Sequence, residues 1–479
     1  MPLAFFIRAL VAAWSLFALG SCAVNPVSGD PNFVLMSEAQ ELRLGAQADQ
    51  ETKKQYALYD INGLQAYVEA LGQKLARASH RPGLSYRFTV VDTPEINAFA
   101  LPGGYVYITR GILAYLNSEA EVAAVLGHEI GHVTARHSVR QMSAAQGADI
   151  ALAIASIFTP ALRNQGGQQV ANLLGTALLS GYGREHELEA DRLGSEYLAR
   201  AGYDPQAMIR VVGVLKNQEL FDAELSKQEG REPSRYHGVF ASHPDNDDRL
   251  KEVVNAANKL RGTQGADERE GFLKRNNGMV FGDGPREGLV RGGVYYHPEL
   301  GFALRPPEGW KLHNLPDRLI MQAPADDARL TMNNAKRGNE QPGEMLRRLL
   351  RRSPRDLDLS PMNGLPAAST AEAGAFAAVV YLRESTYVFS GAFRSEPAYR
   401  RYLEAARAAA RSFHAISDAE RAAAKPLTIR LITATANTRF AALAKNSPLG
   451  RNAENRLRLM NNLYPAGEPA PGQLIKVVE

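Results

Sequence analysis

The chain has 479 residues, of which 45% are hydrophobic and 22% are charged, a composition typical of globular proteins and not of disordered ones. Its length predicts about two to four domains. The formal net charge of +4, from 55 basic and 51 acidic residues, is too evenly balanced to predict nucleic acid as a partner. The single cysteine excludes a disulfide framework and a cysteine-based metal site.

The N-terminus has the pattern of an export signal. Residues 9–19 form an apolar run that follows a single arginine and is too short to span a bilayer. Residues 19–22 (LGSC) resemble the lipobox of bacterial lipoproteins, which would place the lipid on Cys22. Ala23 follows the cysteine directly, at the position where an Asp would favour retention of a lipoprotein in the inner membrane. We therefore expect residues 1–21 to be a lipoprotein signal peptide and the mature protein to face the periplasm from the outer membrane. A cleaved signal peptide with an unmodified cysteine is the alternative.

Residues 22–260 are predicted to form a mainly helical domain, because apolar residues recur there at spacings of three and four. Two extended segments interrupt this pattern. Residues 86–91 form one of them, and residues 97–108 form the other, in which a Pro-Gly-Gly turn leads into the alternating run YVYI. The expected fold class is α+β, with a small sheet inside a helical domain. No later stretch of the chain has the length of a transmembrane helix.

One predicted helix carries a metal-binding motif. Ser118 and Glu121 have the spacing of a capping box and mark its start. Further along it, the sequence HEIGH places His128 and His132 about 40° apart and one turn along the axis, so that both imidazoles can reach one metal ion. Glu129 lies beside this position, where a carboxylate can take a proton from water. A charged helix face without metal is the alternative.

A catalytic zinc usually has a third protein ligand. A second predicted helix, with the sequence REHELEAD, places Glu187 and Asp191 one turn apart on the same face. Glu187 can bind the metal while Asp191 accepts a hydrogen bond from a ligand histidine, which is the gluzincin arrangement. His137 is expected to lie at the surface or near the ligands. Glu189 is expected to face away from Glu187, either exposed to solvent or as a partner of another helix.

Residues 25–250 resemble the HtpX/CAAX-prenyl-protease family of zinc metallopeptidases, in its secreted bacterial branch of BepA-type and Oma-type proteases. The matching segments are NPVSGD, LMSEAQELRLG, NAFALPGGYVYITRG, HEIGH, ELEAD and ASHP. The resemblance implies one Zn²⁺ per chain, held by His128, His132 and Glu187. It also implies that Glu129 is the general base and that Asp191 supports a ligand histidine.

The same resemblance implies that an edge strand binds the substrate by strand addition, with loose sequence preference. The residues of this edge segment are Asn97, Ala98, Phe99, Ala100, Gly103 and Gly104. Gly183 stands where the family pattern has Ser before Arg184. Two roles for Arg184 therefore stay open, a contact with a substrate carboxylate or oxyanion and a purely structural one.

Two further segments have more than one interpretation. His243, in the ASHP segment, either forms part of a structural turn or fills the open metal position as a fourth ligand and keeps the enzyme latent. The apolar segments 148–162 and 170–180 are predicted to be core helices, with a hydrophobic lid as the alternative.

The rest of the chain is predicted to form a linker (261–290), an accessory mixed α/β domain (291–415) and a small unit (426–479). This last unit has the βααβ order of a lysin motif, a module that binds N-acetylglucosamine polymers such as peptidoglycan. Its match is degenerate, because Ala-Asn-Thr at 436–438 replaces the typical Gly-Asp-Thr. Glycan binding and plain packing both remain open.

These patterns together predict a zinc-dependent endopeptidase of the bacterial cell envelope. Its expected substrates are misfolded or stalled envelope proteins, and its expected contact is the outer membrane, through a lipid anchor. Binding of peptidoglycan by the C-terminal unit stays open. One alternative is a periplasmic chaperone or assembly factor whose metal site is structural or latent. The other is a peptidoglycan-binding scaffold.

Overall fold

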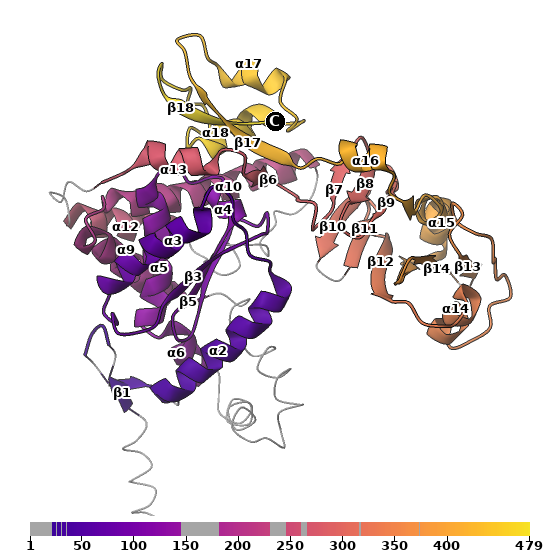
Figure 1. The fold of residues 1–479 in the computed structure, drawn as a ribbon, viewed down its shortest axis with the longest axis horizontal. Helices are drawn as coiled ribbons and strands as arrows, with labels where there is room; N and C mark the ends of the chain where they lie inside the picture. Colours follow the sequence, from indigo (N-terminus) through magenta and orange to yellow (C-terminus); the bar gives the residue numbers. More distant parts are fainter. Residues whose placement is uncertain are drawn as a thin grey trace, which may run out of the picture. The chain divides into compact units, whose positions relative to one another are not determined.

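The computed structural model describes most of the chain as two compact units (Figure 1). The first unit combines residues 1–281 with residues 428–479, and the second comprises residues 282–427. The signal peptide, the apolar segments 148–162 and 170–180, and His243 lie outside the described residues. Those described are 22–24, 26–29, 31–34, 36–144, 182–229, 246–259, 266–315, 318–372 and 374–479.

Helices make up most of the first unit, in accord with the predicted periodicity. They are α2 (Glu38–Gln55), α3 (Leu64–Arg77), α4 (Arg110–Leu113), α5 (Glu119–Thr134), α6 (His137–Ala144), α9 (Arg184–Arg200), α10 (Gln206–Glu229), α12 (Asn246–Lys259) and α13 (Arg269–Asn276). The Ser118 side chain accepts a hydrogen bond from the Glu121 N–H and so begins α5 as predicted. The Glu121 carboxylate accepts the N–H of Asn117 rather than that of Ser118. No helix of the described residues is both long enough and apolar enough to cross a membrane.

A small mixed sheet lies against these helices. Its strand order is β3-β5-β4, where β3 is Arg87–Val91, β5 is Tyr105–Thr109 and β4 is Ala98–Leu101. The strands β3 and β5 run parallel, whereas β4 pairs antiparallel with β5. The turn between β4 and β5 places Gly103 and Gly104 at φ of 80° and 96°, which only glycine adopts without strain. Ahead of this sheet, β1 (Cys22–Val24) pairs antiparallel with β2 (Pro31–Phe33).

Helices α5 and α9 pack closely because glycines lie where they cross. A Cβ added at Gly194 of α9 would lie 2.9 Å from the backbone nitrogen of His128 on α5. A Cβ at Gly131 of α5 would lie 3.0 Å from the carbonyl oxygen of Ala190 on α9. The two backbones are therefore in direct contact, and the side chains that flank the crossing converge.

The C-terminal segment packs onto the helical unit. It comprises β17 (Leu427–Thr433), α17 (Phe440–Lys445), α18 (Ala453–Met460) and β18 (Leu474–Val478), which is the predicted βααβ order. Its sheet has the order β18-β17-β6, and β6 (Val280–Phe281) lies in the stretch predicted to be a linker. The buried Lys476 donates from Nζ to the carbonyls of Ala114 and Leu116, at 2.6 and 2.8 Å. These pairings join residues far apart in the sequence, so no local pattern predicts them.

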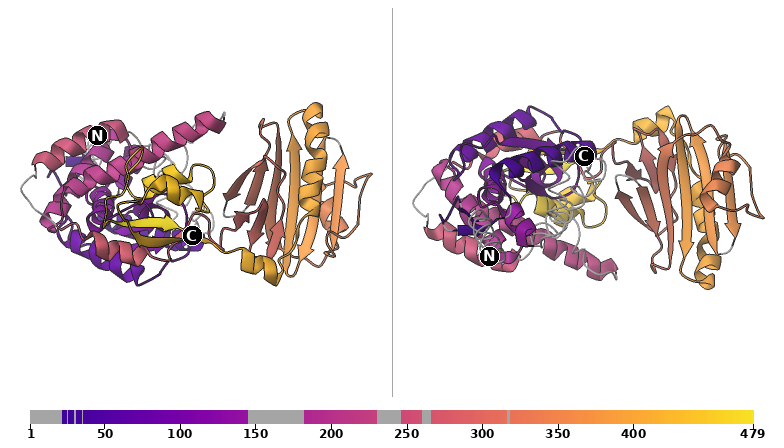
Figure 2. Two further views of the ribbon diagram at one scale, coloured as in Figure 1. Left: turned by 90° about the horizontal axis from the view of Figure 1, so that it is seen from above. Right: turned by 90° about the horizontal axis from the view of Figure 1, so that it is seen from below.

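The second unit is built on two antiparallel sheets, whose strands are visible in both views of Figure 2. The four-stranded sheet has the order β16-β9-β8-β7, with β7 at Leu289–Arg291, β8 at Val294–His297, β9 at Phe302–Leu304 and β16 at His414–Ala415. The six-stranded sheet has the order β10-β11-β12-β15-β14-β13. Its strands are β10 (Lys311–Leu315), β11 (Arg318–Gln322), β12 (Ala328–Lys336), β13 (Ala367–Glu372), β14 (Ala375–Leu382) and β15 (Ser385–Phe393).

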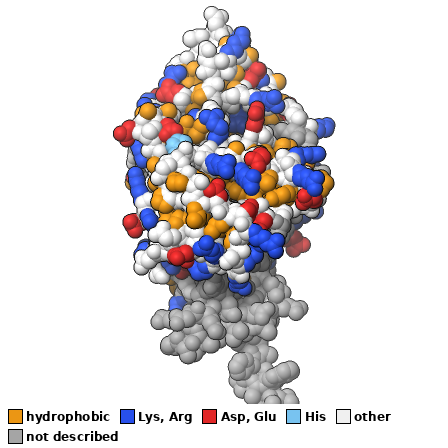
Figure 3. Space-filling model, turned by 90° about the vertical axis from the view of Figure 1, so that its right-hand side faces the viewer, with side chains coloured by type: hydrophobic (Ala, Val, Ile, Leu, Met, Phe, Trp, Pro, Cys, Tyr) orange, Lys and Arg blue, Asp and Glu red, His pale blue; other side chains and the backbone are white. Residues whose placement is uncertain are grey.

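Helices cover both faces of the six-stranded sheet. Alternate residues of β14 pack against α15 (Glu396–Arg411) on one face and against α14 (Pro342–Leu350) on the other, which explains why β14 is apolar throughout. A short helix, α16 (Asp418–Ala423), follows β16. On the molecular face drawn in Figure 3, basic and acidic side chains are interspersed with hydrophobic ones. The α+β class predicted from the sequence is confirmed.

Candidate metal centre

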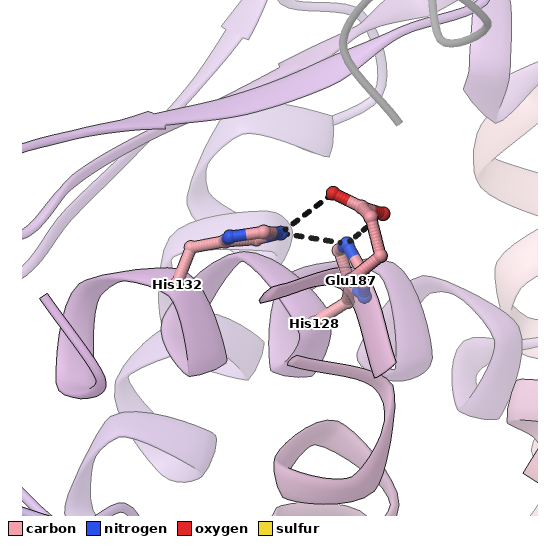
Figure 4. Close-up of side chains that lie close together, drawn as sticks. All are labelled: His128, His132 and Glu187. Carbon is pink, nitrogen blue, oxygen red and sulfur yellow. Dashed lines mark hydrogen bonds and ion pairs between the residues drawn. The ribbon is translucent and has the colours of Figure 1, made fainter. Parts of the chain in front are cut away.

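Three buried side chains from α5 and α9 meet at one point (Figure 4). His128 and His132 come from α5, one turn apart, and Glu187 comes from the first turn of α9. The two histidine Nε2 atoms are 3.0 Å apart. Glu187 places Oε2 3.6 Å from Nε2 of His128 and Oε1 3.4 Å from Nε2 of His132. The structure thus brings together the three ligands expected from the sequence.

His128 is oriented by Asp191. Its Nδ1 lies 2.7 Å from Oδ1 of Asp191, and because a carboxylate only accepts, Nδ1 carries a proton; in the neutral form that binds a metal, Nε2 then presents a lone pair. Burial alone would raise the pKa of Asp191, but the charge of Arg249 and the hydrogen bonds from Arg249 and His128 outweigh burial and hold this pKa below its usual value. Asp191 therefore lies where the sequence predicted it.

His132 is oriented by a second chain of hydrogen bonds. Nε2 of His137 lies 3.1 Å from Oε2 of Glu189, which also accepts a bond of 2.9 Å from Arg140. Burial lowers the pKa of His137, so its ring is neutral and its Nδ1 accepts a 2.9 Å bond from Nδ1–H of His132. The Nε2 of His132 consequently presents a lone pair as well.

This second chain decides between the alternatives that the sequence left open for His137 and Glu189. His137 has 0% of its side chain exposed, so it is not a surface histidine, and it lies against the ligands. Glu189 is a partner of another helix, α6, because its side chain, which is 22% exposed, contacts His137. The reason is that α6 begins at His137, directly after α5, and approaches the flank of α9 that carries Glu189.

These residues fit a zinc ion. With each ring protonated at Nδ1 alone, the two Nε2 lone pairs face each other at 3.0 Å, and a shared cation would stabilise both of them and the neighbouring carboxylate. Two neutral histidines and one glutamate are a donor set of catalytic zinc. Both histidines also have the hydrogen-bonded outer nitrogen that is typical of metal ligands.

Glu129 is buried beside this cluster and lines a small cavity of about 20 Å³. The polar lining comes from His128, Glu129 and Arg249, and the apolar lining comes from β4, α4, α5 and α10 through Ala98, Ile112, Val125, Met208, Val211 and Leu215. The predicted general base and the first residue of β4 therefore share one cavity.

The strand β4 is an edge strand of its sheet, as the family resemblance implied. Its only strand partner among the described residues is β5, and its first residue, Ala98, lines the cavity with Glu129. Two residues on, Ala100 lines a second small cavity together with His132. The strand therefore passes along both histidines of the cluster.

Two predicted residues do not join the cluster in the described part of the chain. Arg184 begins α9 and is exposed, and His243 lies outside the described residues. Sequence reasoning missed two others. Tyr182 stacks on the His132 ring with centroids 4.0 Å apart, and Arg249 of α12 is buried against the acids of α9. No local pattern marks Arg249, because its partners lie about sixty residues earlier in the chain.

The helical unit with its histidine–glutamate cluster has the arrangement of a metallopeptidase site. Residues 62–257 match the model of peptidase family M48, and this segment contains every residue of the cluster. The chain therefore carries a peptidase family M48 domain.

Curated relatives match over this domain and its flanks. The beta-barrel assembly-enhancing protease of Escherichia coli is 31% identical over 234 residues, which are 47% of this chain and 45% of that protein. The mitochondrial metalloendopeptidase OMA1 of Arabidopsis thaliana is 31% identical over 39% of this chain and 38% of its own. The OMA1 of Schizosaccharomyces pombe is 30% identical over 42% of this chain and 59% of its own. The chain thus spans only about half the length of the relatives that it matches.

A solved structure, the cyanobacterial PsbP from Synechocystis, covers 27% of this chain and 98% of its own, with a TM-score of 0.21 and 11% identity. A likeness at this level does not define a fold.

Proposed function

We propose that this protein is a zinc-dependent endopeptidase of the bacterial cell envelope that hydrolyses misfolded or stalled envelope proteins. The observation that carries the proposal is the convergence of His128, His132 and Glu187 next to the buried Glu129, beneath an edge strand. The M48 match supports peptide hydrolysis, and the name of the Escherichia coli relative supports a role in the envelope.

Each residue of the site has a role in this proposal. His128, His132 and Glu187 hold Zn²⁺, which at such a site polarises a peptide carbonyl and makes water more acidic. Glu129 takes the proton from the attacking water and passes it to the leaving amine. Asp191 fixes the orientation of His128.

The strand β4 binds the substrate in an extended conformation, main chain to main chain. Main-chain pairing recognises no particular side chain, so it suits unfolded clients of varied sequence. The edge segment proposed for this contact extends from Asn97 through β4 to the glycines of the turn, Gly103 and Gly104. Arg184 is a candidate contact for a substrate carboxylate.

The decisive experiment is cleavage of an unfolded model protein by the chain from Ala23 onwards, beside its Glu129→Gln variant. We expect the variant to lose cleavage and to keep its zinc, because Glu129 is not one of the three ligands. A matched Glu185→Gln variant, which changes an exposed glutamate of α9, should cleave like the parent. Equal cleavage by the parent and Glu129→Gln would contradict the mechanism.

Latency is a separate question. If neither the parent nor Glu129→Gln cleaves, the proposed fourth ligand His243 becomes the next target. A His243→Ala variant that is more active than the parent would support latency. A variant that stays inactive would favour the chaperone alternative, which a refolding assay with Glu129→Gln tests directly.

The location that we propose for the protein rests on Cys22. We propose that Cys22 carries a lipid anchor that holds the protein on the periplasmic side of the outer membrane. Labelling of cells with a fatty-acid probe should mark the parent and not Cys22→Ala, and the variant should move to the soluble periplasmic fraction. Retention of the label in Cys22→Ala would contradict the proposal.

The C-terminal segment has a candidate site for peptidoglycan. A cavity of about 410 Å³ lies between β17, α17 and α18, and its lining includes Arg430, Asn437, Arg439 and Asn446. Amide and guanidinium groups suit the hydroxyl and acetamido groups of a glycan. Sedimentation with purified peptidoglycan should be weaker for Asn446→Ala than for the parent, and equal sedimentation would favour a plain packing role.

A further inference from the structure

Arg249 of α12 contacts two of the acids at the metal centre at once. Its Nε and Nη2 donate to the two oxygens of Asp191, each at 2.8 Å. Its Nη1 lies 3.2 Å from Oε2 of Glu187. The guanidinium is almost fully buried, with 3% of the side chain exposed. One side chain thus links a proposed metal ligand to the acid that orients another ligand.

The geometry of this contact suits arginine specifically. The planar fork forms two parallel bonds with Asp191, which fix the plane of that carboxylate. The same Oδ1 of Asp191 that receives Nη2 also receives Nδ1–H of His128. The third nitrogen, Nη1, contacts the carboxylate of Glu187. A lysine offers a point charge and cannot make both contacts with fixed geometry.

The charge of Arg249 offsets a repulsion within α9. Glu187 and Asp191 are one turn apart on the same buried helix face, where two carboxylates repel each other. Few water molecules screen this repulsion in the interior. A cation placed between the two acids lets both face the cluster, whereas without it their side chains would separate.

We infer that Arg249 is a positioning residue of the metal centre, which holds Glu187 directly and His128 through Asp191. This inference rests on the proposed metalloprotease function, since it assumes that the cluster binds zinc. It adds α12 to the elements that build the site. The affinity for the metal then depends on the docking of α12 against α9, and not only on the two helices that carry the ligands.

The test measures zinc affinity and not cleavage. The metal is removed from the chain that begins at Ala23, and zinc is titrated back in competition with a chromophoric chelator. We expect Arg249→Met to weaken zinc binding by about 10- to 100-fold, as is typical when an outer partner of a metal ligand is lost. Arg249→Lys should lose part of the affinity, because it keeps the charge and lacks the fork.

A matched control separates positioning from general loss of stability. Arg110→Met also removes a buried arginine from a pair with a carboxylate, here Asp92 at 2.5 Å, which is not part of the cluster. This control should lower the melting temperature while it leaves zinc affinity within about 3-fold of the parent, since neither partner orients a ligand. If Arg249→Met does not fold, Arg249→Lys and Arg249→Gln take its place in the same titration.

A double variant tests the route through Asp191. If Arg249 acts on His128 through Asp191, Asp191→Asn combined with Arg249→Met should weaken binding by less than the product of the two single effects. The inference would be overturned if Arg249→Met, or the variant that replaces it, bound zinc with the same affinity as Arg110→Met. A parent that binds no zinc would instead overturn the metal centre itself, so the two failures are distinguishable.

Discussion

The crossing of α5 and α9 can be tested by adding one methyl group. In Gly194→Ala, the new Cβ would lie 2.5 Å from Cε of Met208 and 2.9 Å from the backbone nitrogen of His128. Met208 ends in a flexible chain and can move. The backbone of α5 cannot move alone, so the two helices must separate by several tenths of an ångström.

The expected magnitude follows from two opposing effects. Overpacking a tight contact costs about 1–3 kcal/mol. Alanine is a better helix former than glycine and recovers about 0.5–1 kcal/mol. The net loss of unfolding free energy should therefore be about 0–2.5 kcal/mol. In Gly213→Ala, on α10, the new Cβ meets nothing within 4 Å, so only the helix-propensity gain of about 0.5–1 kcal/mol remains.

The assay is urea unfolding of the metal-free chain from Ala23, followed by far-ultraviolet circular dichroism. Trp310 is the only tryptophan after Ala23 and lies in the second unit, so its fluorescence reports on that unit separately. We expect opposite signs for the two variants, and weaker zinc binding for Gly194→Ala alone, because a wider crossing moves Glu187 away from the histidines. A Gly194→Ala variant as stable as Gly213→Ala would refute the argument from packing.

Three other changes have expected outcomes. Ser118→Ala removes the N-terminal cap of α5 and should cost about 1 kcal/mol in urea unfolding; an unchanged midpoint would mean that the cap is dispensable. Lys476→Met leaves two buried carbonyls without their donor and should cost about 1–3 kcal/mol in the same assay, whereas unaltered stability would show that the contact contributes nothing net. In the second unit, a backbone hydrogen bond from Ser417 and then His414 lower the pKa of Glu420 to about 2. Burial opposes the charge of His414, but the Ser412 carbonyl and Glu420 raise its pKa above 6.5. The contribution of Glu420 to the free energy of unfolding is lost as pH falls through its lowered pKa. The contribution of His414 is lost as pH rises through its raised pKa. Glu420→Gln should thus lower the melting temperature most between about pH 4.5 and 6.5, and a pH-independent difference would contradict this.

The local sequence pattern was sufficient to predict those parts of the site that lie within one helix or one hairpin. The helix with HEIGH follows from apolar periodicity and a cap at Ser118, and the spacing of four places His128 and His132 on one face in any α-helix. The same spacing applies to Glu187 and Asp191. A Pro-Gly-Gly turn before an alternating run predicts the hairpin of β4 and β5, since the left-handed conformations at Gly103 and Gly104 need glycine.

Apart from Asp191, the contacts that orient the ligands could not be predicted in this way. Glu189 faces away from Glu187 on a regular helix, yet it reaches the cluster through His137, because α6 packs on that flank of α9. Arg249 has no local signature, because its partners belong to another helix. The pairing of β6 with β17 and the burial of Lys476 likewise join distant segments.

The sequence by itself determined the identity of the candidate ligands, the α+β class and the order of most elements, because helical and strand periodicity are properties of neighbouring residues. The tertiary structure alone decided how α5 and α9 cross at Gly194 and Gly131, and which nitrogen of each histidine faces the cluster. It also placed Arg249 between two acids. These features depend on contacts between segments far apart in the chain, and such contacts are set by the packing of whole elements and not by the spacing within any one of them.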